Sequence, residues 1–349
     1  MELYLLGGGL LVPFLAFRPR DFFQPEFFIN LLFVLLIGMG PITLYFFMPD
    51  YYAERAYSEV SLIILLGYLS LNFGFAFARI FSVSPVSLNG LSRNYHSWLI
   101  RKSRGMYILG LMWGLVAIVA GCLYFFRAGS IPLLSANKEE ARVAAMLVSG
   151  NGYLLYLLTI GVIAPSFMAL FYLKDGVPSR LFSPLFIFVV VALVVLLLFT
   201  GSRRYVIWMF IYLLAVYHYS FRAISLSRLL FFSFVGLVFI VLFEIFRNPN
   251  SETTAGFFSA ATYRFIIYTS NLEKVYSYFS GVDKMWGSTL LMDVLTVLPG
   301  KQVDYQSWLK ELVGLEFEGF GIPPTMMGDF YINFGLAGVL VGGGALVFY

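Results

Sequence analysis

Long apolar runs alternate with short polar connections along most of this 349-residue chain. Each run has about 17 to 25 residues, the length at which an α-helix crosses a hydrocarbon core of about 30 Å. Nine runs are found, at residues 1–17, 27–48, 60–81, 105–126, 153–173, 181–199, 205–221, 226–246 and 326–349. The first lacks the basic start and the cleavage site of a signal peptide, so we expect it to stay as a helix. The pattern predicts an all-α bundle of about nine transmembrane helices.

The composition excludes a soluble globular protein. Hydrophobic residues make up 60% of the chain and charged residues 12%, whereas an average soluble domain has about 45–50% and about 25%. With 38 Phe, 23 Tyr and 5 Trp, the apolar surface exceeds what a core of this length could bury, so lipid must cover part of it. The net charge of +4 is small and dispersed, which argues against a nucleic-acid partner.

Lys and Arg in the connections predict the orientation, because these residues concentrate on the cytoplasmic side of a membrane. Alternate connections are basic, at residues 18–20, 93–104, 174–180 and 222–228, whereas the intervening connection 49–59 is acidic. This assignment places the pair Arg203 and Arg204 on the outer face. The two longest non-spanning segments, 127–152 and 247–325, face outward as well.

The outward-facing segment 247–325 is too long for a connector. Its apolar residues recur at helical spacing, with Arg264 and Glu273 elsewhere on the wheel, so we expect an amphipathic helix at the membrane surface. A second helical run, 288–298, ends at a Pro-Gly turn. We therefore divide the chain into transmembrane helices 1–8 with short loops (1–246), a long outer loop with amphipathic helices (247–325) and a last transmembrane helix (326–349).

Arginines gather on the outward-facing side at the membrane boundary. They are the tandem pair after Thr200-Gly201-Ser202, Arg203 and Arg204, together with Arg142, Arg247 and Arg264. A guanidinium at this depth is costly unless it snorkels to the lipid headgroups or binds an anion, and it binds phosphate bidentately. Backbone N–H groups of Gly201 and Ser202 at a helix start would add an anion nest. Snorkelling explains any single arginine, whereas the set favours a diphosphate site.

Several carboxylates lie near these arginines, and each has a structural and a functional interpretation. Glu244 and Arg247 stand three apart near a helix end, either as an ion pair or with Glu244 orienting an Arg247 that binds the ligand. Asp329 enters the first turn of the ninth helix, either as a cap or as a general base at the outer interface. Glu139 and Glu140 are interpreted as the solvated start of a helix.

Missing motifs narrow the chemistry. The sequence has no Asp-x-Asp, no His/Cys metal cluster, no Walker phosphate loop and no Gly-x-Ser-x-Gly, so we expect neither a metal nor a cofactor. The two histidines, His96 and His218, fall on the predicted cytoplasmic side. A proton acceptor on the outer side must then be a carboxylate, a tyrosine or the substrate itself.

Four sequence motifs resemble the bacterial oligosaccharide repeat-unit polymerases, the O-antigen polymerases of the Wzy type. They are Thr-Gly-Ser-Arg-Arg at 200–204, Ile-Pro-Leu-Leu at 131–134 followed by Arg142 and Gly150, Trp-Gly-Ser-Thr at 286–289 before Leu-Pro at 298–299, and Pro323-Pro324 followed by Gly-Asp-Phe-Tyr-Ile-Asn-Phe-Gly at 328–335. The family's closing motif has Glu where this chain has Asp329. Members have further helices after this motif, which implies that the sequence is truncated after 349.

The resemblance implies a glycosyltransferase of the C type (GT-C) in the bacterial inner membrane, with its active site facing the periplasm. Its donor and acceptor would be oligosaccharide units carried on undecaprenyl diphosphate, and its further partners would be membrane lipids and a chain-length-regulating co-polymerase. The five arginines would hold the diphosphate, Asp329 or Glu244 would act in catalysis, and Tyr305 and Trp308 would stack on sugars. Membrane-interface anchoring is the alternative role for these aromatic residues.

Two other functions fit the same architecture. An O-antigen ligase shares the lipid donor, but the outer-side histidine of that family has no counterpart here. A flippase or transporter of the same glycolipid would show broken helices at the bilayer midplane and internal symmetry, and the sequence shows neither.

Overall fold

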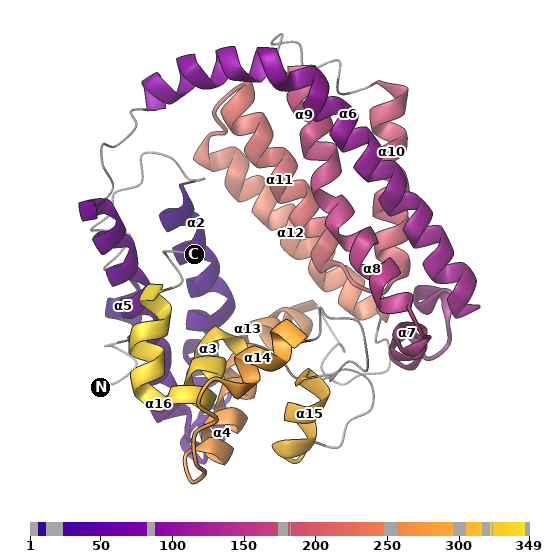
Figure 1. The fold of residues 1–349 in the computed structure, drawn as a ribbon. Helices are drawn as coiled ribbons and strands as arrows, with labels where there is room; N and C mark the ends of the chain where they lie inside the picture. Colours follow the sequence, from indigo (N-terminus) through magenta and orange to yellow (C-terminus); the bar gives the residue numbers. More distant parts are fainter. Residues whose placement is uncertain are drawn as a thin grey trace. The chain divides into compact units, whose positions relative to one another are not determined.

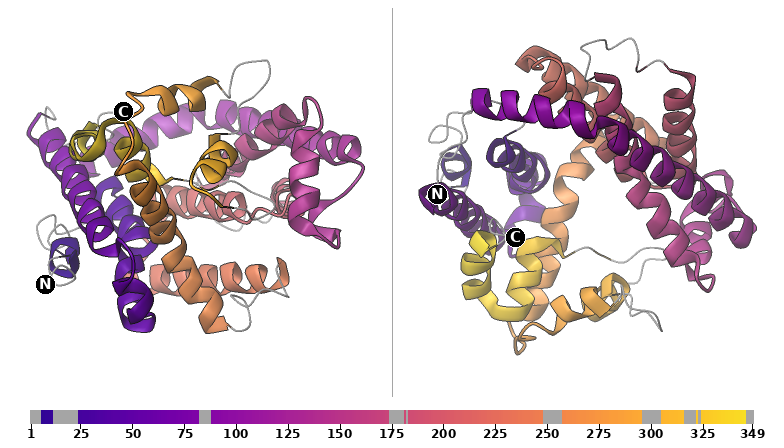
Figure 2. Two further views of the ribbon diagram at one scale, coloured as in Figure 1. Left: turned by 90° about the horizontal axis from the view of Figure 1, so that it is seen from below. Right: turned by 45° about the horizontal axis from the view of Figure 1, so that its top comes forward.

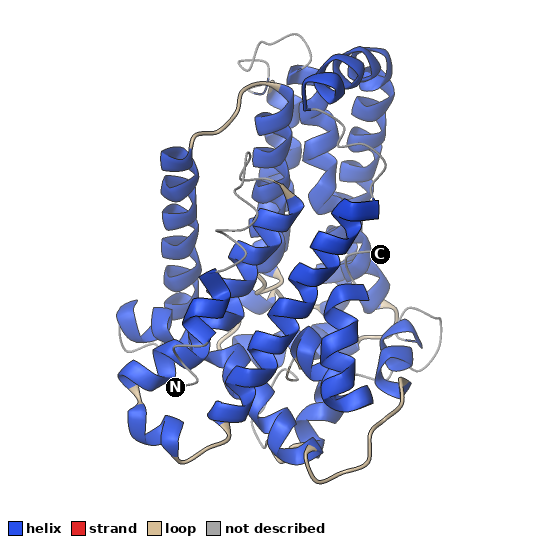
Figure 3. Cartoon of the chain, turned by 90° about the vertical axis from the view of Figure 1, so that its left-hand side faces the viewer, coloured by secondary structure: helices blue, strands red, loops and turns tan. Residues whose placement is uncertain are grey.

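The computed structural model describes residues 6–11, 24–81, 88–173, 181, 183–247, 257–295, 305–315, 322 and 324–345, and within these ranges it consists of helices and loops (Figure 3). Four helices are long and apolar enough to cross a membrane: Glu26–Phe47, Tyr57–Ile80, Ser103–Ala128 and Asn151–Leu173. Pro184–Phe199 and Ser227–Phe243 are shorter apolar helices. The protein is therefore an all-helical, multi-pass membrane protein in the part described, and the count of nine spans stays a prediction.

Eight of the nine predicted runs coincide with helices, and residues 6–11 of the first run are helical too. One boundary is wrong. The basic connection at 93–104 is not a loop, because a single helix runs from Leu88 to Ala128 and includes it. An apolar run shows where a helix is hydrophobic, whereas the backbone hydrogen bonds that define the helix continue into polar sequence.

The chain forms two compact units, which Figures 1 and 2 show in three views. Unit 1 combines Met1–Ser84 with Ser251–Tyr349, and unit 2 is Pro85–Asn250. The helices of unit 1 are α2 (Pro25–Phe33), the π-helical η1 (Val34–Gly38), α3 (Met39–Phe47), α4 (Pro49–Ala53), α5 (Tyr57–Phe81), α13 (Phe257–Phe279), α14 (Ser288–Leu295), α15 (Tyr305–Leu312) and α16 (Thr325–Ala345). Those of unit 2 are α6 (Leu88–Ala128), η2 (Pro132–Leu134), α7 (Lys138–Leu147), α8 (Asn151–Ile160), η3 (Gly161–Ile163), α9 (Ala164–Leu173), α10 (Pro184–Phe199), α11 (Arg204–Ser220) and α12 (Leu226–Arg247).

A proline near the start of α3 explains how α13 packs on that helix. Pro41 has no N–H, so the carbonyl of Ile37, four residues earlier, loses its usual helical partner. The hydroxyl of the fully buried Thr269 on α13 donates to this carbonyl at 3.4 Å. Gly40 permits the approach, because a Cβ there would overlap Thr269 Oγ1 and lie 2.7 Å from the Phe265 carbonyl oxygen. Helix α13 thus satisfies a backbone group that lipid could not.

The helix α13 forms as predicted, but its wheel assignment is wrong at Glu273. This residue is buried, its carboxylate lies 3.6 Å from the Arg55 guanidinium, and it accepts a hydrogen bond from Ser277 at 2.9 Å. Helix α13 packs against α3, α5 and α16 within unit 1. A charged residue is buried here because its partner, Arg55, comes from another helix connection, which the wheel of one helix cannot reveal.

Helices α5 and α16 lie side by side through small residues (Figure 1). A Cβ at Gly343 would lie 2.9 Å from both the Gly67 carbonyl oxygen and Ser70 Oγ. The Ser70 hydroxyl donates to the Leu340 carbonyl and accepts from the Gly344 N–H. Close approach through small residues with a hydroxyl bond is the usual packing of membrane helices. α16 bends at Gly335, whose φ of +64° and ψ of −152° are not helical.

Unit 2 packs around one small-residue face of α6. A Cβ at Gly110 would meet the Ala164 carbonyl oxygen at 2.8 Å, and one at Gly114 would meet Val189 at 2.9 Å. Ala117 is fully buried against Gly161. Helices α8, α9 and α10 therefore pack closely on α6, and apolar contact supplies the core of this unit.

Candidate functional site

The predicted helix junction at residues 200–204 is confirmed in unit 2. Arg203 precedes α11 and Arg204 is its first residue. Gly201 adopts a φ of +78°, a conformation that glycine takes without strain. The predicted anion nest is wrong, because the Gly201 N–H donates to the Leu198 carbonyl at 2.8 Å and the Ser202 N–H donates to the Thr200 hydroxyl at 3.3 Å.

Aromatic rings hold the two junction arginines. The Arg203 guanidinium lies 5.8 Å from the ring centroid of Phe243 on α12. Arg204 is exposed, lies 4.6 Å from the ring centroid of Tyr205 and donates to the Tyr205 hydroxyl at 2.5 Å. A guanidinium has five N–H donors and stays charged, so a ring contact does not by itself use its capacity to bind an anion.

Arg142 lies close to this junction. It lies on α7, and its Cδ is 3.7 Å from where a Cβ of Gly201 would be. Arg127, at the end of α6, donates to the Ser149 carbonyl at 2.6 Å and lies close to Gly150. No signal in the sequence singled out Arg127, because it lies at the end of an apolar run.

Arg203 and Arg204 lie at the positive end of the dipole of α11. A helix N-terminus carries about half a positive charge, so a cation in its first turn costs roughly 0.3–1 kcal/mol. An anion bound at this end would interact favourably with the helix dipole and would also form charge-assisted hydrogen bonds with the two guanidinium groups.

The remaining arginines and Glu244 are placed only by their backbones. Glu244 and Arg247 stand in the last turn of α12, in unit 2. Arg264 stands on α13, in unit 1. Their side chains lie outside the described part of the structure, so their roles stay predictions.

Asp329 in unit 1 does not cap its helix, so the capping interpretation is wrong. α16 begins four residues earlier, and the Thr325 hydroxyl accepts a hydrogen bond from the Gly328 N–H at 3.2 Å. The partly exposed Asp329 carboxylate instead accepts a hydrogen bond from the Tyr305 hydroxyl at 2.5 Å. The family resemblance implied that Tyr305 stacks on sugars, but this residue is 3% exposed and its ring lies beside that of Trp308, with ring centroids 5.9 Å apart.

A buried amide one turn further along α16 joins Asp329 to the turn before α14. The Asn333 side chain donates to the Asp329 carbonyl at 2.8 Å and to the Thr289 hydroxyl at 2.5 Å. Its Oδ1 accepts from the Gly287 N–H at 2.8 Å. The Asn333 carbonyl accepts from the Trp286 N–H at 3.0 Å. Two of the sequence motifs, 286–289 and 328–335, therefore form one hydrogen-bonded unit, which their spacing alone did not predict.

Backbone strain concentrates around this unit. Among the described residues, the non-glycine residues with positive φ are Trp286 at 48° and Thr325 at 64°. Such a conformation costs about 1–3 kcal/mol per residue and persists only where surrounding contacts enforce it. Lys284 supports the same turn, because its ammonium donates to the Phe279 carbonyl at 2.5 Å and lies 4.5 Å from the Tyr331 ring centroid. Burial lowers the pKa of Lys284.

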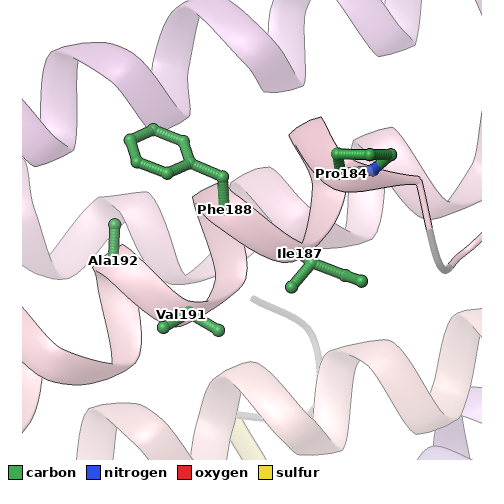
Figure 4. A pocket seen from close by; sticks show the side chains of 5 residues that line it. All are labelled: Pro184, Ile187, Phe188, Val191 and Ala192. Atoms are coloured by element: carbon green, nitrogen blue, oxygen red, sulfur yellow. The ribbon is translucent and has the colours of Figure 1, made fainter.

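A hollow of about 540 Å³ on α10 is not suited to this chemistry. It is lined by one apolar face of that helix, as Figure 4 shows: Pro184, Ile187, Phe188, Val191 and Ala192. None of these side chains can hold an anion or a proton. No cluster of three metal-ligating side chains occurs among the described residues.

The match to a known family covers nearly the whole chain. The family model described as "Putative O-antigen polymerase" matches residues 21–348, which include both polar groups described above. The chain belongs to the O-antigen polymerase family. Comparisons with curated proteins and with solved structures give no match. Membership in the O-antigen polymerase family implies a polymerase of polysaccharide biosynthesis that acts in a membrane on lipid-linked oligosaccharides.

Proposed function

We propose that this O-antigen polymerase is a GT-C-type glycosyltransferase of the bacterial inner membrane. It moves the growing glycan from undecaprenyl diphosphate onto the non-reducing end of a new lipid-linked repeat unit at the periplasmic face. The observation that carries the proposal is the convergence of Arg142, Arg203 and Arg204 at the positive end of α11 in a chain of this family. A lipid diphosphate is an anion that such a group can bind from the membrane boundary.

The arginine group stabilises the leaving diphosphate. As the bond between the sugar's anomeric carbon and the phosphate oxygen breaks, negative charge grows on that oxygen. Cations fixed in advance at this position stabilise the transition state more than the ground state. Arg142, Arg203 and Arg204 do this directly, and Arg247 and Arg264 complete the set when the ligand is bound.

Asp329 accepts the proton of the acceptor hydroxyl. The hydroxyl oxygen forms the new bond to the anomeric carbon, and its proton passes to the Asp329 carboxylate. The hydrogen bond from Tyr305 and the attachment of Asn333 to the Asp329 carbonyl hold this carboxylate in place. Trp308, whose ring lies beside that of Tyr305, stacks on a sugar ring. Glu244, near Arg247, orients the arginine.

The proposal requires that the segments 127–152 and 247–325 both face the periplasm. The parallel course of α5 and the second half of α16 supports this topology, because the sequence places the beginnings of both helices on the outer side. In unit 1, Val339 lies near Gly67 and Gly344 near Gly74, so residue numbers rise in the same direction along both helices.

A reconstituted assay tests the proposal. The purified protein in lipid vesicles receives an undecaprenyl-diphosphate-linked repeat unit, and the lipid-linked products are separated by length. We expect a ladder of longer glycans without any added metal or cofactor. Transfer to a lipid A core without lengthening would indicate a ligase, and movement across the bilayer without lengthening would indicate a flippase. Adding a chain-length-regulating co-polymerase should narrow the length distribution.

A further inference from the structure

The turn before α14 presents an apolar surface that unit 1 does not cover. We call the residues Val282, Trp286, Leu290 and Leu291 the α14 surface. Trp286 is 80% exposed and Leu291 63%, and the other two are also exposed. We propose that the α14 surface rests on the bilayer and contacts phospholipid at the membrane boundary.

The two faces of α14 differ sharply. Thr289 is fully buried against Asn333, and Met292, three residues on, packs against the core of unit 1. Thr289 and Met292 are three residues apart and therefore share one face of the helix, whereas the exposed Leu290 and Leu291 are turned away from that face. A short helix bound to protein on one face and apolar on the other is a typical interfacial element.

The depth of this turn follows from the packing of α16 on α5. Gly343 touches α5 between Gly67 and Ser70, which is the middle of the candidate span Tyr57–Ile80. Eight residues separate Gly343 from Gly335, which is about 12 Å at 1.5 Å per residue. The hydrocarbon core extends about 15 Å from its midplane. The carbonyl that holds the Trp286 N–H belongs to residue 333, just beyond the bend, so Trp286 lies close to the boundary.

The exposed apolar face of α16 continues into the α14 surface. Leu336, Leu340 and Val341 are exposed on the part of α16 that lies alongside the span. Phe334 is exposed as well, and its ring lies 3.6 Å from where a Cβ of Gly287 would be. Lipid that covers the exposed side of the span therefore reaches the α14 surface without a break. An exposed Trp beside Asp283 and Lys284 is the composition found at the membrane boundary.

Contact of the α14 surface with lipid also affects the candidate site at Asp329. Asn333 bonds both the turn and the Asp329 carbonyl, so a turn resting on the bilayer sets the depth of the carboxylate. This inference about lipid contact stands on packing and exposure alone and does not depend on the proposed function.

Nitroxide accessibility tests the inference in the full chain, reconstituted in vesicles of phosphatidylcholine and phosphatidylglycerol. In a Cys122→Ser background, Trp286→Cys and Leu291→Cys carry the label, and Glu311→Cys on α15 is the water control because Glu311 is exposed. The native Cys122, exposed within the span Ser103–Ala128, gives the hydrocarbon reference. We measure collision with oxygen, which concentrates in lipid, and with a nickel chelate, which stays in water.

We expect the ratio of oxygen to nickel collisions at positions 286 and 291 to exceed that at 311 severalfold and to fall below that at 122. A ratio equal to that at 311 would overturn the proposal, since the surface would face water and be open to a sugar. Protection from both reagents would overturn it too, because protein, such as a second copy of the chain, would then cover the surface. Trp286→Phe, in a chain without label, should reduce the quenching of tryptophan fluorescence by brominated phospholipid.

Discussion

Unit 1 joins buried polar side chains to one another by hydrogen bonds, whereas unit 2 displays its cations at helix ends, against aromatic rings and a backbone carbonyl. In unit 1, Asn30 and Asn72 exchange amide hydrogen bonds at 2.8 and 2.9 Å, and Asn333 reaches back 44 residues to Thr289. In unit 2, Arg204 bonds the adjacent Tyr205.

This difference between the units predicts which substitutions affect folding stability and which affect the reaction. A buried polar network loses more than one bond when one member changes, because the partners remain buried without a donor or acceptor. A cation on a helix end contributes little to folding, and its removal relieves the unfavourable interaction with the helix dipole. We therefore expect unit 2 arginine variants to fold normally and unit 1 variants to separate into folding and catalytic classes.

The largest effect should come from Asp329→Asn. We expect the rate of polymer formation to fall about 100- to 10,000-fold, because Asn accepts the Tyr305 hydrogen bond but takes no proton. The melting temperature should stay near that of the wild type. Asp283→Asn, in an exposed turn of the same unit, is the matched control. Full activity of the Asp329 variant would leave Glu139, Glu140, Glu244 and Glu252 as candidates for the base.

The next effect should come from the junction arginines. Arg203→Ala and Arg204→Ala should each lower polymer formation about 100- to 1,000-fold, since each removes a donor to the charge that develops on the diphosphate. Lysine at either position should restore part of the rate, because it supplies the charge but not the planar fork.

Two further arginines serve as the controls for this pair. Arg222 and Arg228 are exposed between α11 and α12 and at the start of α12, away from the junction. Alanine at these positions should leave polymer formation near the wild-type level. Wild-type activity of both junction variants would place the diphosphate site elsewhere.

Gly40→Ala should lower the free energy of unfolding. The added methyl overlaps Thr269 Oγ1, so α3 and α13 must separate, at a cost of about 1–3 kcal/mol. A lower melting temperature in detergent reports this change. Gly105→Ala is the matched control, since nothing lies within 4 Å of its added Cβ. Equal melting temperatures for the two variants would contradict the contact at Gly40.

The smallest effect should come from Tyr305→Phe. The carboxylate of Asp329 loses one hydrogen-bond donor but keeps its charge, so we expect about a tenfold lower rate. Because the lost bond favours the charged form of the carboxylate, the acid side of the pH–rate profile should move to higher pH. A wild-type profile would assign Tyr305 to packing alone.

The helices were largely predictable from the sequence, since an apolar run of membrane length is a local feature of the chain. The errors have local causes too. The start of α6 at Leu88 was missed because basic residues suggested a loop, and Asp329 was placed in a first turn because the apolar run began one residue after Thr325.

The residue types of the candidate site could be predicted from the sequence, but only some of the contacts between those residues could. The Arg203–Arg204 junction depends on a turn of three residues, so its position followed from sequence alone. The bond between Tyr305 and Asp329 and the attachment of Asn333 to 286–289 depend on how separate helices pack. One sequence holds no direct signal for such contacts, although the strained Trp286 lies in a motif that the sequence analysis had already singled out.

The bond between Thr269 and the Ile37 carbonyl has a consequence for biosynthesis. The two residues are 232 positions apart. At about 5–20 residues per second, the ribosome needs roughly 10 to 50 s to travel from one to the other. During this interval the α2–α3 span stands in the bilayer with the small groove at Gly40 open, while residues 85–250, contiguous in sequence, emerge and pack as unit 2. Unit 1 is completed last. A messenger RNA that ends before codon 269 would therefore yield a folded unit 2 and an N-terminal pair of spans that lack α13.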